Sequence, residues 1–266
     1  MGSATADFSL RRLVDNSFRA IDQGIYELKH SPITHDAISL RKAVTSCPHV
    51  PLITEIKFSS PSQGKIRSIS TPVNIAKTMV RSGAIGISVL TQPHFFEGSP
   101  QHMAAIRRAI ASTPLLMKDI IVSTVQIDTG KQLGADCILL IKPVFDRDMA
   151  EDSMEKLAEY SKRKGLQVLV EVHKEQELAE VVKAKYELIG INNRNLDNLE
   201  VDITHTEKLL KTHAKGSSII ISESGISAPT DILYLRRAGA DAFLVGTSIM
   251  QTQDIGAKIT KLYNAY

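Results

Sequence analysis

Short apolar runs that end in charged or amide side chains recur along this sequence. The clearest is residues 115–119, where Lys118 and Asp119 close a run that otherwise has the composition of a buried strand. An ammonium group is rarely buried without a partner, so a lysine there needs a carboxylate, a phosphate or a reaction to serve. Runs 52–57, 168–173, 188–194 and 219–224 end in the same way. Apolar strands with polar carboxyl ends are typical of a barrel whose active site lies at one rim.

Eight runs of this kind predict eight strands. They are nearly continuous in apolar residues rather than alternating, as expected of parallel strands that are covered by helices. The predicted strands are residues 51–57, 85–91, 114–119, 137–141, 167–172, 188–192, 219–224 and 242–246.

Helical patterns separate these runs. Thr71-Pro72 and Ser99-Pro100 each place an N-cap residue before a proline at the first helical position. Lys164-Gly165 supplies a cation and a glycine where a helix is expected to end. Residues 123–134 also have a helical pattern, although Gly130 interrupts it. Further apolar stripes predict helices around 178–182, 209–210, 232–238 and 255–263.

Strict alternation of strand and helix predicts right-handed crossovers and a parallel sheet, and eight units favour closure into a barrel. We therefore predict an α/β fold, a single (β/α)8 TIM barrel that takes up residues 1–266, a usual size for this fold. Residues 1–50 lie outside the eight units and are predicted to form an N-terminal helical extension, with helices at 10–28 and 36–44. We expect this extension to cap the barrel or cover part of its catalytic rim.

Composition narrows the class of protein further. The formal net charge of +3 suits an enzyme for anionic substrates at least as well as a nucleic-acid binder, and no run of five lysines or arginines occurs. Cys47 and Cys137 show neither a disulfide framework nor a zinc pattern, and the histidines lack metal-ligand spacing. No apolar stretch of about 18 residues and no signal peptide is visible. We expect a soluble cytoplasmic protein with no membrane or nucleic-acid partner.

Charged side chains at the strand ends are predicted to meet in one pocket. Side chains alternate along a strand, so Glu55 and Lys57 share a face, as do Asn192 and Arg194. A single strand-end lysine or glutamate is more often part of a salt bridge at the rim than catalytic. The same pattern at six strand ends favours a catalytic or binding role over rim salt bridges, because salt bridges at the rim need no such regularity. The converging residues are Glu55, Lys57, Lys118, Glu171, Asn192, Arg194 and Glu223.

The last two strands are each followed by a glycine-containing loop. Ser222-Glu223-Ser224-Gly225-Ile226-Ser227 follows the seventh apolar run, and Val245-Gly246-Thr247-Ser248 follows the eighth. In barrels of this kind, these two loops often bind phosphate through backbone N–H groups and a helix N-terminus. Either loop alone is weak evidence, but the pair in this place predicts a phosphate site.

Two further residues leave alternatives open. His173 has the parity of Glu171, so it is either a general base or a structural histidine beside the pocket. Asp119 either orients Lys118 or points outward into the following loop, and we favour the second. No nucleophile elbow supports Ser/His/Asp chemistry.

Taken together, these residues resemble the indole-3-glycerol phosphate synthase family over nearly the whole chain, from about Leu52 to Met250. The resemblance depends on a set of short strings in order at strand ends, none specific alone. They are Glu55-Ile56-Lys57 with Ser60-Pro61-Ser62, Ser88-Val89-Leu90-Thr91, Phe96-Glu97-Gly98-Ser99, Lys118-Asp119, Gly134-Ala135-Asp136, Glu171-Val172-His173, Gly190-Ile191-Asn192-Asn193-Arg194 and Ser222-Glu223-Ser224-Gly225-Ile226.

The resemblance implies a lyase of tryptophan biosynthesis whose substrate is the phosphosugar 1-(2-carboxyphenylamino)-1-deoxyribulose 5-phosphate. Ring closure, decarboxylation and dehydration give indole-3-glycerol phosphate, and neither a cofactor nor a metal is implied. A monomer is expected, and association with other tryptophan-pathway enzymes is left open.

The resemblance also implies a role for each matching residue. Lys118 matches the principal general acid, Glu171 the acid/base residue of dehydration, and Lys57 a second lysine for proton transfer or anion binding. Glu55 is expected to hold Lys118 through a salt bridge. The remaining matches are Asn192, Arg194 and Glu223 for orienting the substrate, Ser60 for substrate contact, and Ser224, Gly225, Gly246 and Thr247 for phosphate.

One position departs from the family pattern. An aromatic residue usually follows the Lys-Asp pair and packs on the substrate ring, but this chain has Ile120 there and contains no tryptophan. Phe96, with Phe95 as a second candidate, can still supply one aromatic face. We therefore expect weaker substrate binding, by about 0.5–1.5 kcal/mol, rather than loss of activity.

Three other functions compete with the synthase. A class I aldolase would use Lys118 as a Schiff-base nucleophile, and borohydride trapping would reveal it. A phosphoribosyl-sugar isomerase would not need this lysine. A non-catalytic scaffold is compatible with the fold but not with retention of both lysines and three carboxylates.

Overall fold

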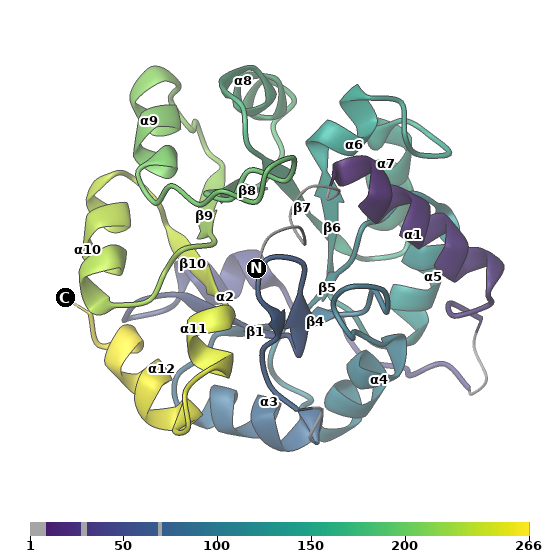
Figure 1. The fold of residues 1–266 in the computed structure, drawn as a ribbon, viewed down its shortest axis with the longest axis horizontal. Helices are drawn as coiled ribbons and strands as arrows, with labels where there is room; N and C mark the ends of the chain where they lie inside the picture. The colour runs from purple at the N-terminus through teal and green to yellow at the C-terminus, as the bar shows by residue number, and fades with distance from the viewer. Residues whose placement is uncertain (1–8, 28–30, 69–70, 266) are drawn as a thin grey trace, which may run out of the picture.

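Eight parallel strands close into a barrel at the centre of the molecule (Figure 1). The structure is a computed structural model, and it describes residues 9–27, 31–68 and 71–265. All eight predicted strands are confirmed, and no end differs from its predicted position by more than one residue. The strands are β1 (Leu52–Ile56), β4 (Gly86–Leu90), β5 (Leu115–Lys118), β6 (Cys137–Ile141), β7 (Gln167–Val172), β8 (Leu188–Asn192), β9 (Ile219–Glu223) and β10 (Ala242–Val245).

Neighbouring strands pair in chain order, and β10 returns to pair with β1. The register places Leu90 opposite Lys118, and Asn192 opposite Glu223. Polar residues that end different strands therefore stand at one level of the barrel. This alignment creates the site described below.

A ring of helices covers the outside of the barrel (Figure 1). Ser99 caps α4 (Pro100–Ala109) by accepting a hydrogen bond from the backbone N–H of Gln101 at 3.2 Å. Gly130 lies inside α5 (Thr124–Gln132) because a Cβ there would come within 2.7 Å of the Met117 sulfur on β5. The glycine thus allows close packing of helix on strand. The ring consists of α3 (Pro72–Arg81), α4 (Pro100–Ala109), α5 (Thr124–Gln132), α7 (Met154–Arg163), α8 (Glu175–Lys183), α9 (His205–Thr212), α10 (Pro229–Arg237) and α12 (Ile255–Tyr263).

Three small features were not predicted from the sequence. A short hairpin, β2 (Ser59–Ser60) with β3 (Gly64–Lys65), follows β1, and its two-residue strands are too short to show a period. The helix α6 (Lys142–Asp146) begins directly after β6, and α11 (Thr247–Met250) begins directly after β10. The hairpin and α11 both contribute residues to the site.

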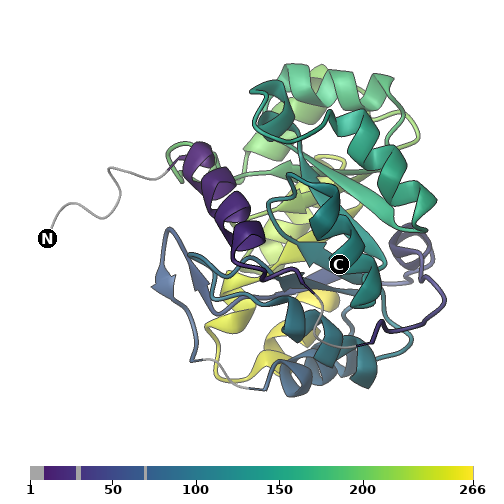
Figure 2. The ribbon, with the colours of Figure 1, turned by 90° about the vertical axis from the view of Figure 1, so that its right-hand side faces the viewer.

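The N-terminal segment packs against both ends of the barrel. The helix α1 (Leu10–Asp22) is shorter than predicted, because Gln23 ends it and Gly24 turns left-handed at φ 68°. The predicted end at residue 28 falls outside the described residues. The helix α2 (Leu40–Thr45) begins at the N-cap Ser39, four residues later than predicted. In Figure 2, α1 lies at the same end of the barrel as the hairpin, and α2 lies at the opposite end.

The core has two layers. One lies between the strands and the outer helices, and the other fills the barrel interior. The interior layer includes Leu13 of α1 and Leu40 of α2 together with strand residues such as Ile53 and Leu244. A Cβ on Gly86 would lie 3.0 Å from Leu40, so α2 seals the amino end of the barrel closely. Within the described ranges, no helix is long and apolar enough to span a membrane.

Candidate active site

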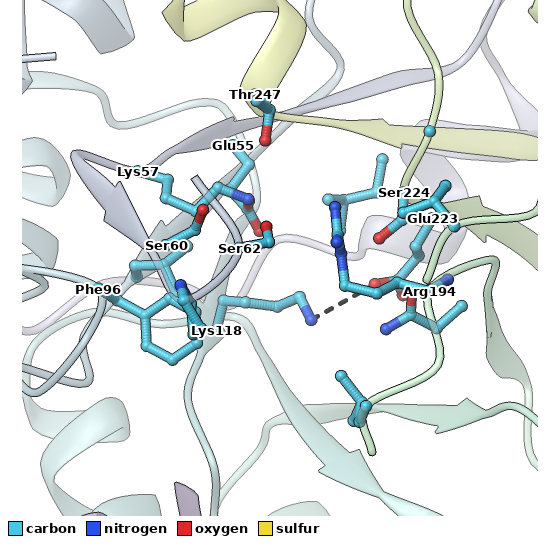
Figure 3. Close-up of a pocket in the computed structure, with 18 of the residues that line it drawn as sticks. Glu55, Lys57, Ser60, Ser62, Phe96, Lys118, Arg194, Glu223, Ser224 and Thr247 are labelled. Carbon is cyan, nitrogen blue, oxygen red and sulfur yellow. Dashed lines mark hydrogen bonds and ion pairs between the residues drawn. The ribbon is translucent and has the colours of Figure 1, made fainter. Parts of the chain in front are cut away.

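A pocket of about 390 Å³ opens at the carboxyl ends of the strands. The loops after the strands wall it, and Figure 3 shows ten of its residues labelled. All fourteen residues predicted for the site line this one pocket. They are Glu55, Lys57, Lys118, Glu171, Asn192 and Glu223, then Ser60, Phe96, Ile120 and Arg194, and then Ser224, Gly225, Gly246 and Thr247.

Lys118 reaches across the pocket to two carboxylates. Its Nζ lies 2.8 Å from Glu171 Oε2 and 3.4 Å from Glu223 Oε2, and its side chain is 15% exposed (Figure 3). Burial alone would lower the pKa of Lys118, but the two carboxylates outweigh it and raise that pKa. The ammonium is therefore charged throughout the neutral range and fixed in direction.

The predicted salt bridge between Glu55 and Lys118 is wrong. Glu55 Oε1 instead lies 2.7 Å from Lys57 Nζ. The two residues share a face of the same strand, two positions apart, so Lys57 reaches Glu55 first. Burial tends to raise the pKa of Glu55, but Lys57 and Lys118 more than offset this and lower it. Glu55 is thus an ionised partner of Lys57, and it acts on Lys118 only through the longer-range electrostatic interaction of the two charges.

Glu223 is the most perturbed acid of the pocket. Burial, opposed by Lys118 and reinforced by the charge of Glu171, raises the pKa of Glu223 to about 8. Its Oε1 has no hydrogen-bond partner among the described residues. A Cβ on Gly190 would lie 2.2 Å from that oxygen, so only glycine leaves room for it. Glu223 can consequently hold a proton at neutral pH.

Asn192 links two members of the site. Its Nδ2 donates to Glu171 Oε1 at 2.8 Å, and its Oδ1 accepts from the Arg194 backbone N–H at 2.9 Å. The Arg194 guanidinium donates to the Leu199 carbonyl at 2.7 Å. These bonds hold the Glu171 carboxylate toward Lys118 and hold the arginine at the pocket wall.

The loops after β9 and β10 lie side by side at one end of the pocket. Ser224 and Gly225 have φ values of 69° and 82°, two successive left-handed residues. A Cβ on Gly225 would meet Val201 at 2.8 Å, and one on Gly246 would meet Glu55 Oε1 at 2.6 Å. Both glycines are therefore required by close approach, and they let the loop backbone border the pocket.

The hairpin after β1 and the loop after β4 form the opposite wall. The Ser59 backbone N–H donates to the Phe96 carbonyl at 3.2 Å, which joins the two loops. The Ser60 hydroxyl is buried without a hydrogen-bond partner among the described residues. Phe96 lines the pocket, whereas Phe95 turns away to pack under the Arg12 guanidinium, 5.0 Å from its ring centroid. Phe96 is thus the aromatic side chain available to a ligand ring.

His173 is not among the residues that line the pocket, and Asp119 lines it but turns its carboxylate away from Lys118. His173 stacks on His205 with ring centroids 4.2 Å apart, and its Nδ1 bonds to the Asn192 carbonyl at 2.8 Å. This arrangement supports the structural alternative for His173. The favoured prediction that Asp119 points outward into the following loop is wrong, because the residue is 1% exposed and accepts hydrogen bonds from Tyr26 at 2.8 Å and from Thr91.

Sequence reasoning missed much of the apolar lining. Leu139 and Ile141 of β6 could have been found, because they share a face of a predicted strand. Leu13 of α1 and Leu196 of the loop after β8 carry no such signal, since their places depend on how distant segments dock. Other missed lining residues are Gln63, Gln92, Leu199, Val201 and Gln251. In the part of the chain that is described, no group of three His, Cys, Asp or Glu residues could hold a metal ion.

Comparison with known proteins identifies similar chains. The family model described as indole-3-glycerol phosphate synthase matches residues 14–262. An indole-3-glycerol phosphate synthase of Caldanaerobacter subterraneus subsp. tengcongensis is 42% identical over 205 residues, 77% of each chain. One from a Polaromonas species is 38% identical over 231 residues, 87% of this chain and 85% of its own. The crystal structure of 3-hexulose-6-phosphate synthase is similar with a TM-score of 0.61 at 15% identity, over 81% of this chain and 99% of that one. At that identity, the structural likeness shows the barrel fold alone.

Proposed function

Since this chain belongs to the indole-3-glycerol phosphate synthase family, we propose that the pocket residues carry out that reaction by general acid–base catalysis. The activity is that of the family, a carboxy-lyase reaction of tryptophan biosynthesis. Its substrate is 1-(2-carboxyphenylamino)-1-deoxyribulose 5-phosphate. The aromatic ring attacks the sugar ketone, carbon dioxide and water leave, and indole-3-glycerol phosphate is formed.

The ion triad of Lys118, Glu171 and Glu223 carries the proposal. Attack on the ketone places negative charge on its oxygen, and the Lys118 ammonium donates a proton there as the carbon–carbon bond forms. Glu171, 2.8 Å from Lys118, then acts as the acid/base group of dehydration. Lys57, paired with Glu55 at the carboxyl end of β1, assists proton transfer or holds an anionic group. General acid–base steps of this kind contribute about 10²–10⁴-fold each.

Binding is assigned to the surrounding walls. Asn192, Arg194 and Glu223 orient the substrate carboxylate and hydroxyls, and Ser60 contacts the substrate from the hairpin. Phe96 and Ile120 flank the aromatic ring. The phosphate is assigned to the paired loops of Ser224-Gly225 and Gly246-Thr247, where glycines let backbone N–H groups approach an anion.

Replacing Lys118 by alanine tests the proposal. Wild-type protein mixed with the carboxyphenylamino-deoxyribulose phosphate is expected to give indole fluorescence. Lys118→Ala is expected to lower kcat by at least about 10²-fold because the acid is lost. A Lys164→Ala control removes a lysine paired with Asp128 on the outer helices and is expected to keep full activity. Unchanged turnover by Lys118→Ala would overturn the assignment of the acid.

The family assignment leaves the aldolase, isomerase and scaffold alternatives without support. We propose in addition that the protein needs no cofactor or metal and works in the cytoplasm as a monomeric single domain spanning residues 1–266, with residues 1–50 as its extension. In support of a monomer, only Val125 and Val201 are exposed among the large apolar side chains of the described residues. Sedimentation of the purified protein tests the monomer.

A further inference from the structure

A buried carboxylate lies directly behind the catalytic strand end. Asp119 follows the catalytic lysine and points to the other face of the chain, where it is 1% exposed. Tyr26 and Thr91 donate their hydroxyls to Oδ2, the first at 2.8 Å. The Ile120 backbone N–H donates to Oδ1 at 2.8 Å and Gln126 Nε2 donates at 3.4 Å. Four donors from four separate segments thus meet on one carboxylate.

Among the described residues, no cation forms an ion pair with Asp119. The groups that act on Asp119 are the four neutral donors, and burial raises its pKa to about 6. A buried carboxylate without an ion-pair partner is costly, and an apolar side chain of similar size is often the more stable choice. Stability alone therefore does not account for a carboxylate at this position.

The donors to Asp119 also hold its neighbours on both sides. The Thr91 backbone N–H donates to the Lys118 carbonyl at 3.1 Å. Gln126 Nε2 donates to the Ile120 carbonyl at 2.9 Å. The two residues that flank Asp119 are both pocket residues, so the cluster fixes the backbone from which Lys118 and Ile120 enter the site.

Tyr26 brings the N-terminal segment into this cluster. Besides donating its hydroxyl to Asp119, Tyr26 accepts at its carbonyl a hydrogen bond of 2.6 Å from Thr129 on α5. Its side chain is 3% exposed, so the bond to Asp119 is shielded from water. The segment that leaves α1 is thereby attached to the end of β5 rather than lying loosely over it.

We propose that Asp119 is a positioning residue that gathers Tyr26, Thr91, Gln126 and the Ile120 N–H around itself and so holds Lys118 in its reactive position. This inference rests on the proposed role of Lys118 as the acid. It predicts that removing the Tyr26 or the Thr91 hydroxyl lowers kcat more than it changes KM, because Ile120 of the binding wall keeps its own bonds to Asp119 and Gln126. A misplacement well under 1 Å is sufficient, since about 1 Å can cost 10²-fold in rate.

The pH dependence of kcat distinguishes a positioning role of Asp119 from a role in stability alone. Tyr26 is the titratable group that faces Asp119 from the N-terminal segment; Thr91 and Gln126 do not titrate, and Lys118 points to the opposite face. When Asp119 gains a proton it becomes a donor and can no longer accept all four bonds, so kcat falls as the pH falls through about 6. The bond from Tyr26 lowers this pKa, and its loss moves the acid limb to higher pH. Glu223, whose pKa is about 8, titrates on the alkaline side of the profile, so the loss of the Tyr26 bond does not change that side.

The experiment compares Tyr26→Phe with Tyr160→Phe. Tyr160 donates to Asp128 at 2.8 Å between outer helices, a matched Tyr–Asp bond remote from the pocket. Tyr26→Phe is expected to lower kcat by about 3–10-fold and to shift the acid limb of the pH profile of kcat to higher pH. Tyr160→Phe is expected to change neither the rate nor the profile. Thr91→Val is expected to act like Tyr26→Phe, and Thr91→Ser, which keeps the hydroxyl, to restore wild-type behaviour.

Each result decides between the two proposals. A wild-type protein with no turnover of the carboxyphenylamino-deoxyribulose phosphate overturns the proposed function and this inference with it. If the wild type turns over the substrate normally and the acid limb of Tyr26→Phe lies at the same pH as that of the wild type, the inference about Asp119 is overturned and the proposed function stands. An equal loss of kcat in Tyr160→Phe also overturns it, because the effect would then follow stability rather than the Asp119 cluster.

Discussion

The charges of individual residues in the pocket are balanced until one carboxyl takes a proton. Lys57, Lys118 and Arg194 supply three cations, and Glu55, Glu171 and Glu223 supply three carboxyl groups; Asp119, a further lining residue, turns its carboxylate away to Tyr26 and the Ile120 N–H and is left out of this balance. With a pKa of about 8, Glu223 is protonated at neutral pH, which leaves an excess of one positive charge. That excess favours a substrate that carries both a phosphate and a carboxylate.

Raising the pH through 8 is therefore expected to weaken substrate binding. Ionisation of Glu223 cancels the excess charge, and KM is expected to rise by about tenfold, the equivalent of roughly 1.4 kcal/mol. Glu223→Gln keeps a neutral side chain of the same size, so its KM is expected to stay flat across the same range. Steady-state kinetics of both proteins on either side of pH 8 provide the test. A rise of KM in the glutamine variant would assign the effect to another group.

At the scale of elements, Arg67 is one of the residues that fasten the hairpin of β2 and β3, beside the bond from Ser59 to Phe96 and the bond from Gln251 to Gln63. Arg67, which follows the hairpin, donates its Nε to the Met250 carbonyl at 2.8 Å and a second nitrogen to the Thr252 carbonyl. These bonds tie the hairpin to the end of α11, so the walls that carry Ser60 and Thr247 are joined across the mouth. The anchor is made to backbone carbonyls, which a flexible monodentate side chain reproduces poorly.

Arg67→Met is expected to raise KM by about 5–10-fold, the loss of roughly 1 kcal/mol, while the melting temperature changes little. The substitution removes the two bonds from Arg67 to the end of α11 and leaves the barrel strands unchanged. Lys65→Met, at an exposed position of the same hairpin, is the control and is expected to behave like the wild type. Equal KM values for the two variants would show that the anchor does not govern binding.

Prediction from sequence succeeded where the signal is local to one element. Each strand of the barrel carries its own apolar run, and alternation along the strand places Lys118 and Asp119 on opposite faces. It failed for the partner of Glu55, because choosing between Lys57 and Lys118 requires distances across the barrel. It also failed for Leu13, which reaches the pocket only because α1 docks at the barrel mouth, and no periodicity within α1 specifies that.

At the scale of the whole molecule, stability and activity are divided between the two ends of the barrel. The carboxyl end holds the charged pocket, with Gly225 and Gly246 in its wall. The amino end is sealed by α2, where Leu40 is 1% exposed and packs into the interior layer. Substitutions at the two ends should thus differ in what they change.

Leu40→Ala is expected to destabilise the protein by about 2–5 kcal/mol, as for other buried leucines, and to leave kcat and KM unchanged below the melting transition. Leu13→Ala, in a pocket residue of α1, is expected to lower both stability and substrate affinity. Denaturant unfolding and kinetics on the two variants provide the comparison. Loss of activity in folded Leu40→Ala would show that the two ends are coupled.

The closure of the barrel by β10 against β1 has a consequence for synthesis on the ribosome. The helices α1 and α2 emerge first, yet the interior layer on which they pack includes Ile219 and Ile221 of β9 and Leu244 of β10. Their docking surface is incomplete until the last strand has been made. The first helices of the chain are therefore among the last to find their places, and they must wait for nearly the entire polypeptide to be translated.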